Sequence, residues 1–157
     1  MKAATVHELK KELGTLDHSR LLEICLRLAK FKKDNKELMT YMLFEADDED
    51  QYIESVKSEM QEIMESMNRY STFYMKKTMR KTIRYMDKFV RYSGLKETEA
   101  EIRISFCEMV RELKVPIHRS KVMTNMFNRQ LKKINTALSK LHEDLQYDYQ
   151  GRIDEIS

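Results

Sequence analysis

Glycine and proline are scarce in this chain, whose 157 residues include three glycines and one proline. Tight turns depend on residues that reach positive φ or hold φ fixed, which is what glycine and proline supply. A β-sandwich or β-barrel requires many such turns, so the scarcity argues against an all-β fold. Apolar residues instead recur at helical spacing along most of the chain. The sequence therefore predicts an all-α protein.

The length predicts one domain, residues 1–157, with a short tail after Gly151. We expect an antiparallel helical bundle of about six to seven helices; an irregular α-α superhelix is the alternative. Thr5 and Glu8 have the spacing of a capping box at the start of the first helix. The expected helices cover residues 5–13, 17–33, 34–44, 47–67, 74–92, 98–113 and 127–145.

Two of these helices carry specific expectations. Apolar residues cover more than one stripe of the segment 17–33, so this helix is predicted to be central and buried on several sides. In the segment 127–145 apolar residues recur at alternating four- and three-residue steps, as in a coiled-coil seam. That seam closes either against the rest of the chain or against a second copy, which makes a homodimer through the C-terminal heptad helix an open alternative.

Net charge, cysteine content and the length of the apolar runs indicate in which compartment the protein is expected. The formal charge is +3, too small to indicate a polyanion binder by itself. Cys25 and Cys107 are the only cysteines and lie in apolar helical runs, which favours free thiols in a reducing compartment. No run approaches the roughly 18 uncharged residues of a membrane span, and no signal peptide is recognisable. We expect a cytoplasmic protein that does not enter the membrane.

Charge is segregated between two neighbouring predicted helices. Nine acidic residues and one lysine lie between Glu45 and Glu65, whereas eight basic residues and one aspartate lie between Arg69 and Arg91. Asn68–Thr72 separates them, because poor helix formers and a slip of the apolar phase predict a break there; a kinked continuous helix is the alternative. The simplest interpretation is an antiparallel hairpin whose opposite charges attract across the pair.

A basic stripe on the helix 74–92 supports a second interpretation, binding of nucleic acid or another polyanion. Its residues recur every three or four positions, so they share one side of the helix. The stripe consists of Lys77, Arg80, Lys81, Arg84, Lys88 and Arg91. A further basic cluster would strengthen this interpretation if the fold brought the two together. That cluster consists of Lys114, His118, Arg119, Lys121, Arg129, Lys132 and Lys133.

Methionine replaces leucine in the same region, since no leucine occurs between Phe44 and Gly94. Methionine fills irregular cores, and it also lines adaptable partner-binding grooves. An exposed methionine face would indicate protein recognition; ordinary core packing is the alternative. The candidate partner-binding residues are Tyr74, Met75, Met79 and Met86.

Motifs for catalysis and for metal or cofactor binding are missing. None of the four histidines follows a glutamate by three residues, as a di-iron bundle requires. No Cys-x-x-Cys pair, glycine-rich phosphate loop or nucleophile elbow is present. We therefore expect no enzymatic activity and no cofactor. The sequence favours a non-enzymatic helical interaction or scaffold module with a protein partner, and nucleic-acid or polyanion binding is the alternative.

Two resemblances add to this interpretation. The segment Thr5–Leu13 resembles the first helix of SAP-type and Rho N-terminal helical modules, some of which bind nucleic acid. The stretches 21–46 and 74–107, with the motifs Lys76-Lys77-x-x-Arg80-Lys81, Tyr92-Ser93-Gly94 and Phe106-Cys107, resemble an uncharacterised helical protein family of Bacteroidetes-type bacteria. The second resemblance implies a bacterial, cytoplasmic protein and transfers no functional residue.

Overall fold

The computed structural model describes residues 1–157, and all of its regular elements are helical. Eight α-helices, one more than the upper expectation, are joined by a π-helical segment and a short 3-10 helix. The chain divides into two compact units, which we call the N-terminal unit, Met1–Phe44, and the C-terminal unit, Glu45–Ser157. The expectation of a single domain therefore stays a prediction. No helix combines the length and apolar content that a membrane span requires.

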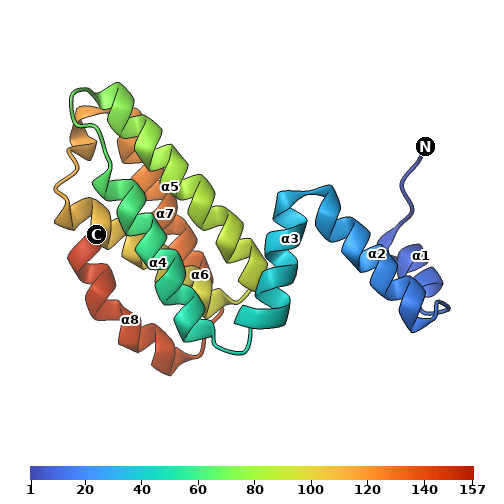
Figure 1. Ribbon diagram of the computed structural model, residues 1–157. Helices are drawn as coiled ribbons and strands as arrows, with labels where there is room; N and C mark the ends of the chain where they lie inside the picture. Colours follow the sequence, from blue (N-terminus) through green and yellow to red (C-terminus); the bar gives the residue numbers. More distant parts are fainter. The chain divides into compact units, whose positions relative to one another are not determined.

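The N-terminal unit holds three helices (Figure 1): α1 Val6–Leu13, α2 His18–Phe31 and α3 Lys33–Thr40, which the π-helical segment Tyr41–Glu45 follows. The predicted capping box is confirmed, because the Glu8 amide donates to the Thr5 hydroxyl and the Thr5 amide donates to the Glu8 carboxylate. The prediction that the helix 17–33 forms the central core is wrong, since α2 has no buried residue. Within this unit α3 is the helix that packs closely on it.

The C-terminal unit is a bundle around α6 (Figure 1). Its elements are α4 Glu49–Glu65, α5 Thr72–Ser93, α6 Lys96–Glu112, the 3-10 helix Ile117–Arg119, α7 Lys121–Leu138 and α8 Glu143–Ile156. Helix α6 packs against α4, α5, α7 and α8, and most of its residues are buried. The largest fully buried side chains include Phe106, Phe127, Met60, Met64, Met79 and Met86. The methionine-rich segment therefore contributes core packing, the alternative that the sequence left open.

Several predicted boundaries can be compared with the observed ones. The break between the acidic and basic helices is confirmed, because α4 ends at Glu65 and α5 begins at Thr72. Gly94 ends α5 in the left-handed conformation, with a φ of 71°. The long helix 127–145 is wrong, since α7 ends at Leu138 and α8 begins at Glu143. The tail after Gly151 is also wrong, because that residue lies inside α8.

The heptad seam closes within the C-terminal unit. Phe127, Ile134 and Leu138 are buried, and α6 is the helix with which α7 makes its most extensive contact. These side chains are therefore unavailable to a second copy unless the bundle opens. The homodimer expected as an alternative through this helix lacks an exposed seam.

Candidate polyanion-binding groove

Two stripes of opposite character run along α5. Met75, Met79, Met86 and Val90 are buried and hold the helix against the bundle. The expectation that the three methionines present an exposed partner-binding face is wrong, because packing against the neighbouring helices covers them. Tyr74, the fourth candidate, is 42% exposed, and its ring lies edge-on to Phe73 at 5.4 Å.

The basic stripe lies on the accessible side of α5. Lys77, Arg80, Lys81, Arg84 and Arg91 are exposed, as the helical spacing predicted. Lys88 is half-buried, and its ammonium group lies 4.9 Å from the centre of the Phe89 ring. Burial of the methionine stripe fixes the rotation of α5 about its axis, so the same packing that hides the methionines presents the cations.

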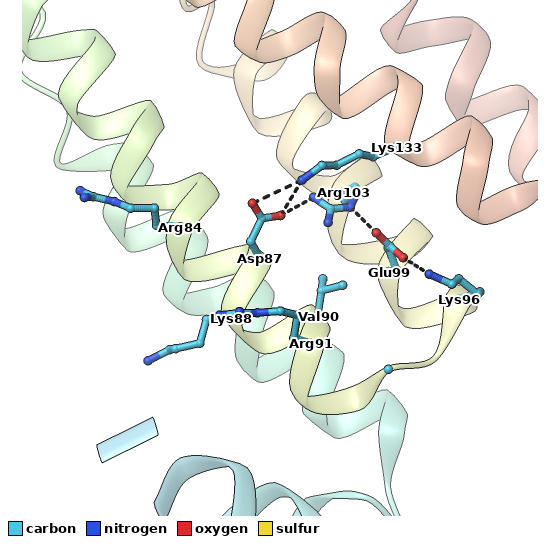
Figure 2. A pocket seen from close by; sticks show the side chains of 10 residues that line it. Arg84, Asp87, Lys88, Val90, Arg91, Lys96, Glu99, Arg103 and Lys133 are labelled. Atoms are coloured by element: carbon cyan, nitrogen blue, oxygen red, sulfur yellow. Dashed lines mark hydrogen bonds and ion pairs between the residues drawn. The ribbon is translucent and has the colours of Figure 1, made fainter. Parts of the chain in front are cut away.

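Basic residues of α7 join this stripe across a groove. Helices α5 and α7 pack together, and a cavity of about 560 Å³ lies between them. Its charged and polar lining residues are Arg80, Arg84, Asp87, Asn125, Arg129, Gln130 and Lys133. A second cavity of about 870 Å³ shares Arg84, Asp87 and Lys133 with the first and continues to Lys88, Arg91 and Lys96 (Figure 2). We call the two adjoining cavities the basic groove.

The fold therefore brings only part of the second predicted cluster to the stripe. Arg129 and Lys133 line the basic groove. The remaining members, Lys114, His118, Arg119, Lys121 and Lys132, do not line either cavity. Lys77 and Lys81 of the stripe also lie outside the lining, although both are exposed.

A buried arginine forms the floor of the groove (Figure 2). Arg103 of α6 is 3% exposed, and one of its Nη1 hydrogen bonds goes to Asp87 Oδ1 of α5 at 2.8 Å. The same nitrogen donates to Gln130 Oε1 of α7 at 2.8 Å, and its Nε donates to Glu99 Oε1 at 3.0 Å. Arg103 thereby joins three helices at one point. It fixes the relative positions of α5 and α7, the two walls that carry the accessible cations.

The two carboxylates at the floor are matched by further cations. Lys133 Nζ lies 3.1 Å from Asp87 Oδ1, and Lys96 Nζ lies 2.7 Å from Glu99 Oε2. Burial by itself would raise the pKa of Glu99. The hydrogen bonds from Lys96 and Arg103 outweigh that effect and hold the pKa below its ordinary value. Glu99 is therefore a charged structural partner of these cations at neutral pH and not a proton donor.

Four arginines remain uncommitted around this floor. Arg80, Arg84 and Arg91 of α5 and Arg129 of α7 form no hydrogen bond or ion pair through their side chains. Each guanidinium group can therefore donate hydrogen bonds to an added anion without losing an internal one. The groove thus combines a neutralised floor with accessible cations on both walls.

Three acidic residues near the start of α4 line a cavity other than the basic groove. With residues from the start of α6 they line a separate cavity of about 410 Å³, whose acidic members are Glu49, Asp50, Glu54, Glu97 and Glu101. Glu49 accepts a hydrogen bond from the Thr98 hydroxyl at 2.5 Å. Lys57 and Arg152 bind Glu101 at 3.0 and 2.6 Å. The attraction expected between the acidic helix α4 and the basic helix α5 does not engage the arginines of the basic stripe in ion pairs.

Sequence reasoning missed Arg103 and Lys96, which complete the groove. Arg103 stands between Ile102 and Ile104 in a segment where almost every residue is buried. A single charge within a run of apolar residues is the signal that could have identified a buried, paired arginine. Nothing in the local pattern indicates that its partners are Asp87 and Gln130, because both lie on other helices.

The cysteines and acidic residues add no reactive centre to this description. Burial raises the pKa of the Cys107 thiol to about 12, because its apolar surroundings disfavour the charged thiolate. Cys25 is exposed, although it lies in an apolar run of the sequence. No group of three or more histidine, cysteine or carboxylate side chains is arranged to hold a metal ion.

Comparison with known proteins assigns neither a family nor a function to this chain. No protein-family model, no curated protein and no solved structure matches this chain. The resemblance to a Bacteroidetes-type helical family therefore stays an expectation from the sequence.

Proposed function

We propose that this protein is a non-enzymatic binding module that holds the phosphate backbone of a nucleic acid in the basic groove of its C-terminal unit. The observation that carries the proposal is the convergence of two basic segments on one groove while four arginines stay uncommitted. The segments, on α5 and α7, lie about 40 residues apart in the sequence. Their convergence is a property of the fold, which distinguishes it from a charged helix face that merely meets solvent.

The spacing of the cations suits an extended polyanion. From Arg80 to Arg91 the stripe covers about 17 Å of helix, with a basic residue about every 5–6 Å. Arginine can bind phosphate oxygens through two parallel hydrogen bonds. Tyr85 and Tyr92 pack against Phe89, with ring centres 4.5 and 5.4 Å apart, which leaves them poorly placed to stack on bases. We therefore expect backbone binding with weak sequence preference.

The separation of acidic and basic grooves favours the same function. Acidic residues of α4 would repel phosphate if they shared the groove, but none of them lines it, and Glu49, Asp50 and Glu54 line the separate cavity formed with α6 and α8. Asp87 and Glu99 are the carboxylates in the basic groove, and both are paired with cations. The nearest competing charges are therefore already neutralised.

Salt-dependent binding tests the proposal. A short fluorescently labelled DNA duplex is titrated with the full chain, and anisotropy gives the Kd between about 50 and about 200 mM salt. Four phosphate contacts predict a slope of about −3.5 for log K against log salt, a loss of affinity of roughly a hundredfold over that range. Absence of binding at the lower salt concentration, or an affinity insensitive to salt, contradicts the proposal.

Charge-reversal variants locate the site. We expect Arg84→Glu and Arg129→Glu each to weaken binding at least tenfold and to reduce the slope by about 1. Lys140→Glu is the matched control, because it makes the same charge change at an exposed residue outside the groove. If the control weakens binding as much as the groove variants, the attraction is a property of net charge and the groove is not the site.

Binding of a protein partner is a second candidate function. The feature that supports it is not the methionine face of α5 on which the sequence-based expectation rested. The methionine face of α5 is buried and no longer supports it. The N-terminal unit supports it instead, because large apolar side chains of α1, α2 and α3 are exposed there.

A further inference from the structure

The lining of the basic groove differs between its two ends. Near the start of α7, the smaller cavity is lined by three apolar residues in addition to its cations: Ile83, Val122 and Met126. Val122 is 41% exposed, so this apolar surface is open to solvent. The larger cavity, toward the end of α5, has Val90 as its one apolar side chain (Figure 2). We call the part lined by Ile83, Val122 and Met126 the apolar end of the groove, which a phosphate backbone alone would leave uncovered.

Phe73 continues the basic stripe of α5 beyond this end. At about 100° per residue, it lies within about 20° of both Arg80 and Arg84 around the helix axis. It precedes Arg80 by two helical turns, which is about 10 Å along the axis, with Lys77 between them. Because Phe73 is 64% exposed, packing of the bundle leaves most of its ring available. A polyanion that follows the arginines toward the start of α5 therefore reaches an aromatic ring.

Phe73 lies on the side of α5 that is nearer to α7. Asp87, which binds Lys133 of α7 at 3.1 Å, is about 40° from Phe73 around the helix axis. Phe89, whose ring centre lies 6.4 Å from that of Tyr52 of α4, is about 160° from Phe73. The acidic helix α4 therefore packs against a different side of α5, and Phe73 shares its side with the cations of the groove.

Tyr70 and Tyr74 enlarge the aromatic surface around Phe73. Tyr70 is 90% exposed, and its amide donates to the Asn68 side chain at 2.9 Å, a hydrogen bond within the loop that carries it. The Tyr74 ring and the Phe73 ring meet edge-on, with their centres 5.4 Å apart. Such a contact uses one face of one ring, so the pair keeps exposed ring faces. We call Tyr70, Phe73 and Tyr74 the aromatic patch.

Nucleobases match this combination of cations, apolar surface and aromatic rings. Every base has an aromatic face that stacks on a phenylalanine or tyrosine ring, while the phosphates beside it bind arginine. In a duplex the bases are stacked inside, so a duplex offers the groove its phosphates and leaves the aromatic patch without a partner. Packed helices have axes roughly 8–10 Å apart, so the groove between α5 and α7 admits one strand. The ligand that uses all three features is therefore a single strand.

We propose that the groove binds a single-stranded nucleic acid, with its phosphates on the arginines of α5 and α7 and its bases against the apolar end of the groove and the aromatic patch. This inference rests on the proposed function, because the arginines bring the strand to the patch. It adds the form of the nucleic acid and a second set of contacts. Stacking accepts every base, so the expected sequence preference stays weak.

Three labelled probes of about 12 nucleotides test the proposal with the full chain. They are an oligothymidylate, the same strand with its bases replaced by abasic sites, and a duplex. We expect the oligothymidylate to bind at least about fivefold more tightly than the other two, because stacking on one aromatic residue supplies that factor. An abasic strand or a duplex that binds as tightly as the oligothymidylate overturns the proposal. If Arg84→Glu still weakens binding in that case, phosphate binding in the groove stands without it; if no probe binds, the proposed function itself fails.

Phe73→Leu locates the stacking contact, because it removes the ring and keeps an apolar side chain at an exposed position. We expect this variant to bind the oligothymidylate at least about fivefold more weakly with an unchanged salt slope, since stacking is not screened, and to bind the abasic strand as the unaltered protein does. Phe31→Leu is the matched control, the same change at a residue of the N-terminal unit that is 79% exposed. Unchanged binding by Phe73→Leu, or an equal loss in the control, overturns the proposal. Arg84→Glu should lower the salt slope instead, which separates loss of a phosphate contact from loss of stacking.

Discussion

Replacement of Arg103 by methionine tests the role of the buried arginine at the floor of the groove. The substitution keeps much of the apolar stem and removes the guanidinium group. Hydrogen bonds to Asp87, Glu99 and Gln130, at 2.8, 3.0 and 2.8 Å, are lost together. The three acceptors are left without the donor that joins α5, α6 and α7.

The expected loss follows from the burial of each partner. Removing one member of a buried ion pair costs about 3–5 kcal/mol, because the remaining charge is left uncompensated. The Asp87 side chain is 35% exposed and keeps Lys133, while Glu99 is 15% exposed and keeps Lys96. These remaining partners place the loss near the lower limit, at about 3 kcal/mol. That corresponds to a decrease in Tm of roughly 6–12 °C.

Urea unfolding followed by circular dichroism measures this loss, and Lys133→Met provides the control. Lys133 is 44% exposed and binds the same carboxylate, so its removal should cost less than about 1 kcal/mol. If Arg103→Met loses less than about 1 kcal/mol, or is more stable than the unaltered protein, the ion pairs do not hold the groove walls and apolar packing suffices.

The pH dependence provides an internal check on the same variant. The pKa of Glu99 is lower in the folded protein than its ordinary value. The contribution of this group to the free energy of unfolding is therefore at its full size when the pH is above the ordinary pKa. It is lost as the pH falls through the folded pKa. Arg103→Met removes one of the two hydrogen bonds that lower this pKa. The difference in free energy of unfolding between the unaltered protein and Arg103→Met should therefore become smaller as the pH falls below about 4. A difference that widens there would contradict the assignment.

Two further predictions concern glycine and the attachment of α8. Gly94→Ala should lower the free energy of unfolding by about 1 kcal/mol, because Gly94 has a φ of 71°. Gly151→Ala should raise the free energy of unfolding by up to about 1 kcal/mol, because Gly151 lies inside a helix and an added Cβ would meet nothing within 4 Å. Denaturant titration of both variants would refute the argument if the two changes had the same sign. Arg152 binds Glu108 at 2.7 and 2.8 Å and Glu101 at 2.6 Å, so Arg152→Ala should accelerate amide hydrogen exchange in α8 at least tenfold while α7 stays protected. Equal acceleration in both helices would show that α8 does not open separately.

Helix positions were largely predictable, and helix ends followed local chemistry. The capping residues Thr5 and Glu8 marked the start of α1, and Gly94 marked the end of α5. Local rules failed where a continuous pattern crossed a turn, since the heptad spacing runs from α7 into α8 through Ser139–His142. Apolar spacing is a property of one segment, whereas the position of a turn depends on what the segments on either side pack against.

The position of the core was not predictable from composition. Helix α2 is rich in leucine yet exposed, and α6 contains Arg103, Ser105 and Thr98 yet forms the centre of the bundle. A hydrophobic helix becomes a core helix only when several neighbours pack around it. Helix α6 has four such neighbours in the C-terminal unit, and within the N-terminal unit α2 packs closely on α3.

The sequence alone determined that the chain is helical, because three glycines and one proline cannot supply the turns of a β fold, and it determined which cations share a side of α5, because helical periodicity fixes that arrangement. Only the tertiary structure decided that the methionines are buried, that Arg129 and Lys133 face the α5 stripe, and that Arg103 neutralises the groove floor. Local spacing acts within a few residues. Burial and the pairing of charges on different helices depend on contacts between distant segments, which the packing of the bundle creates.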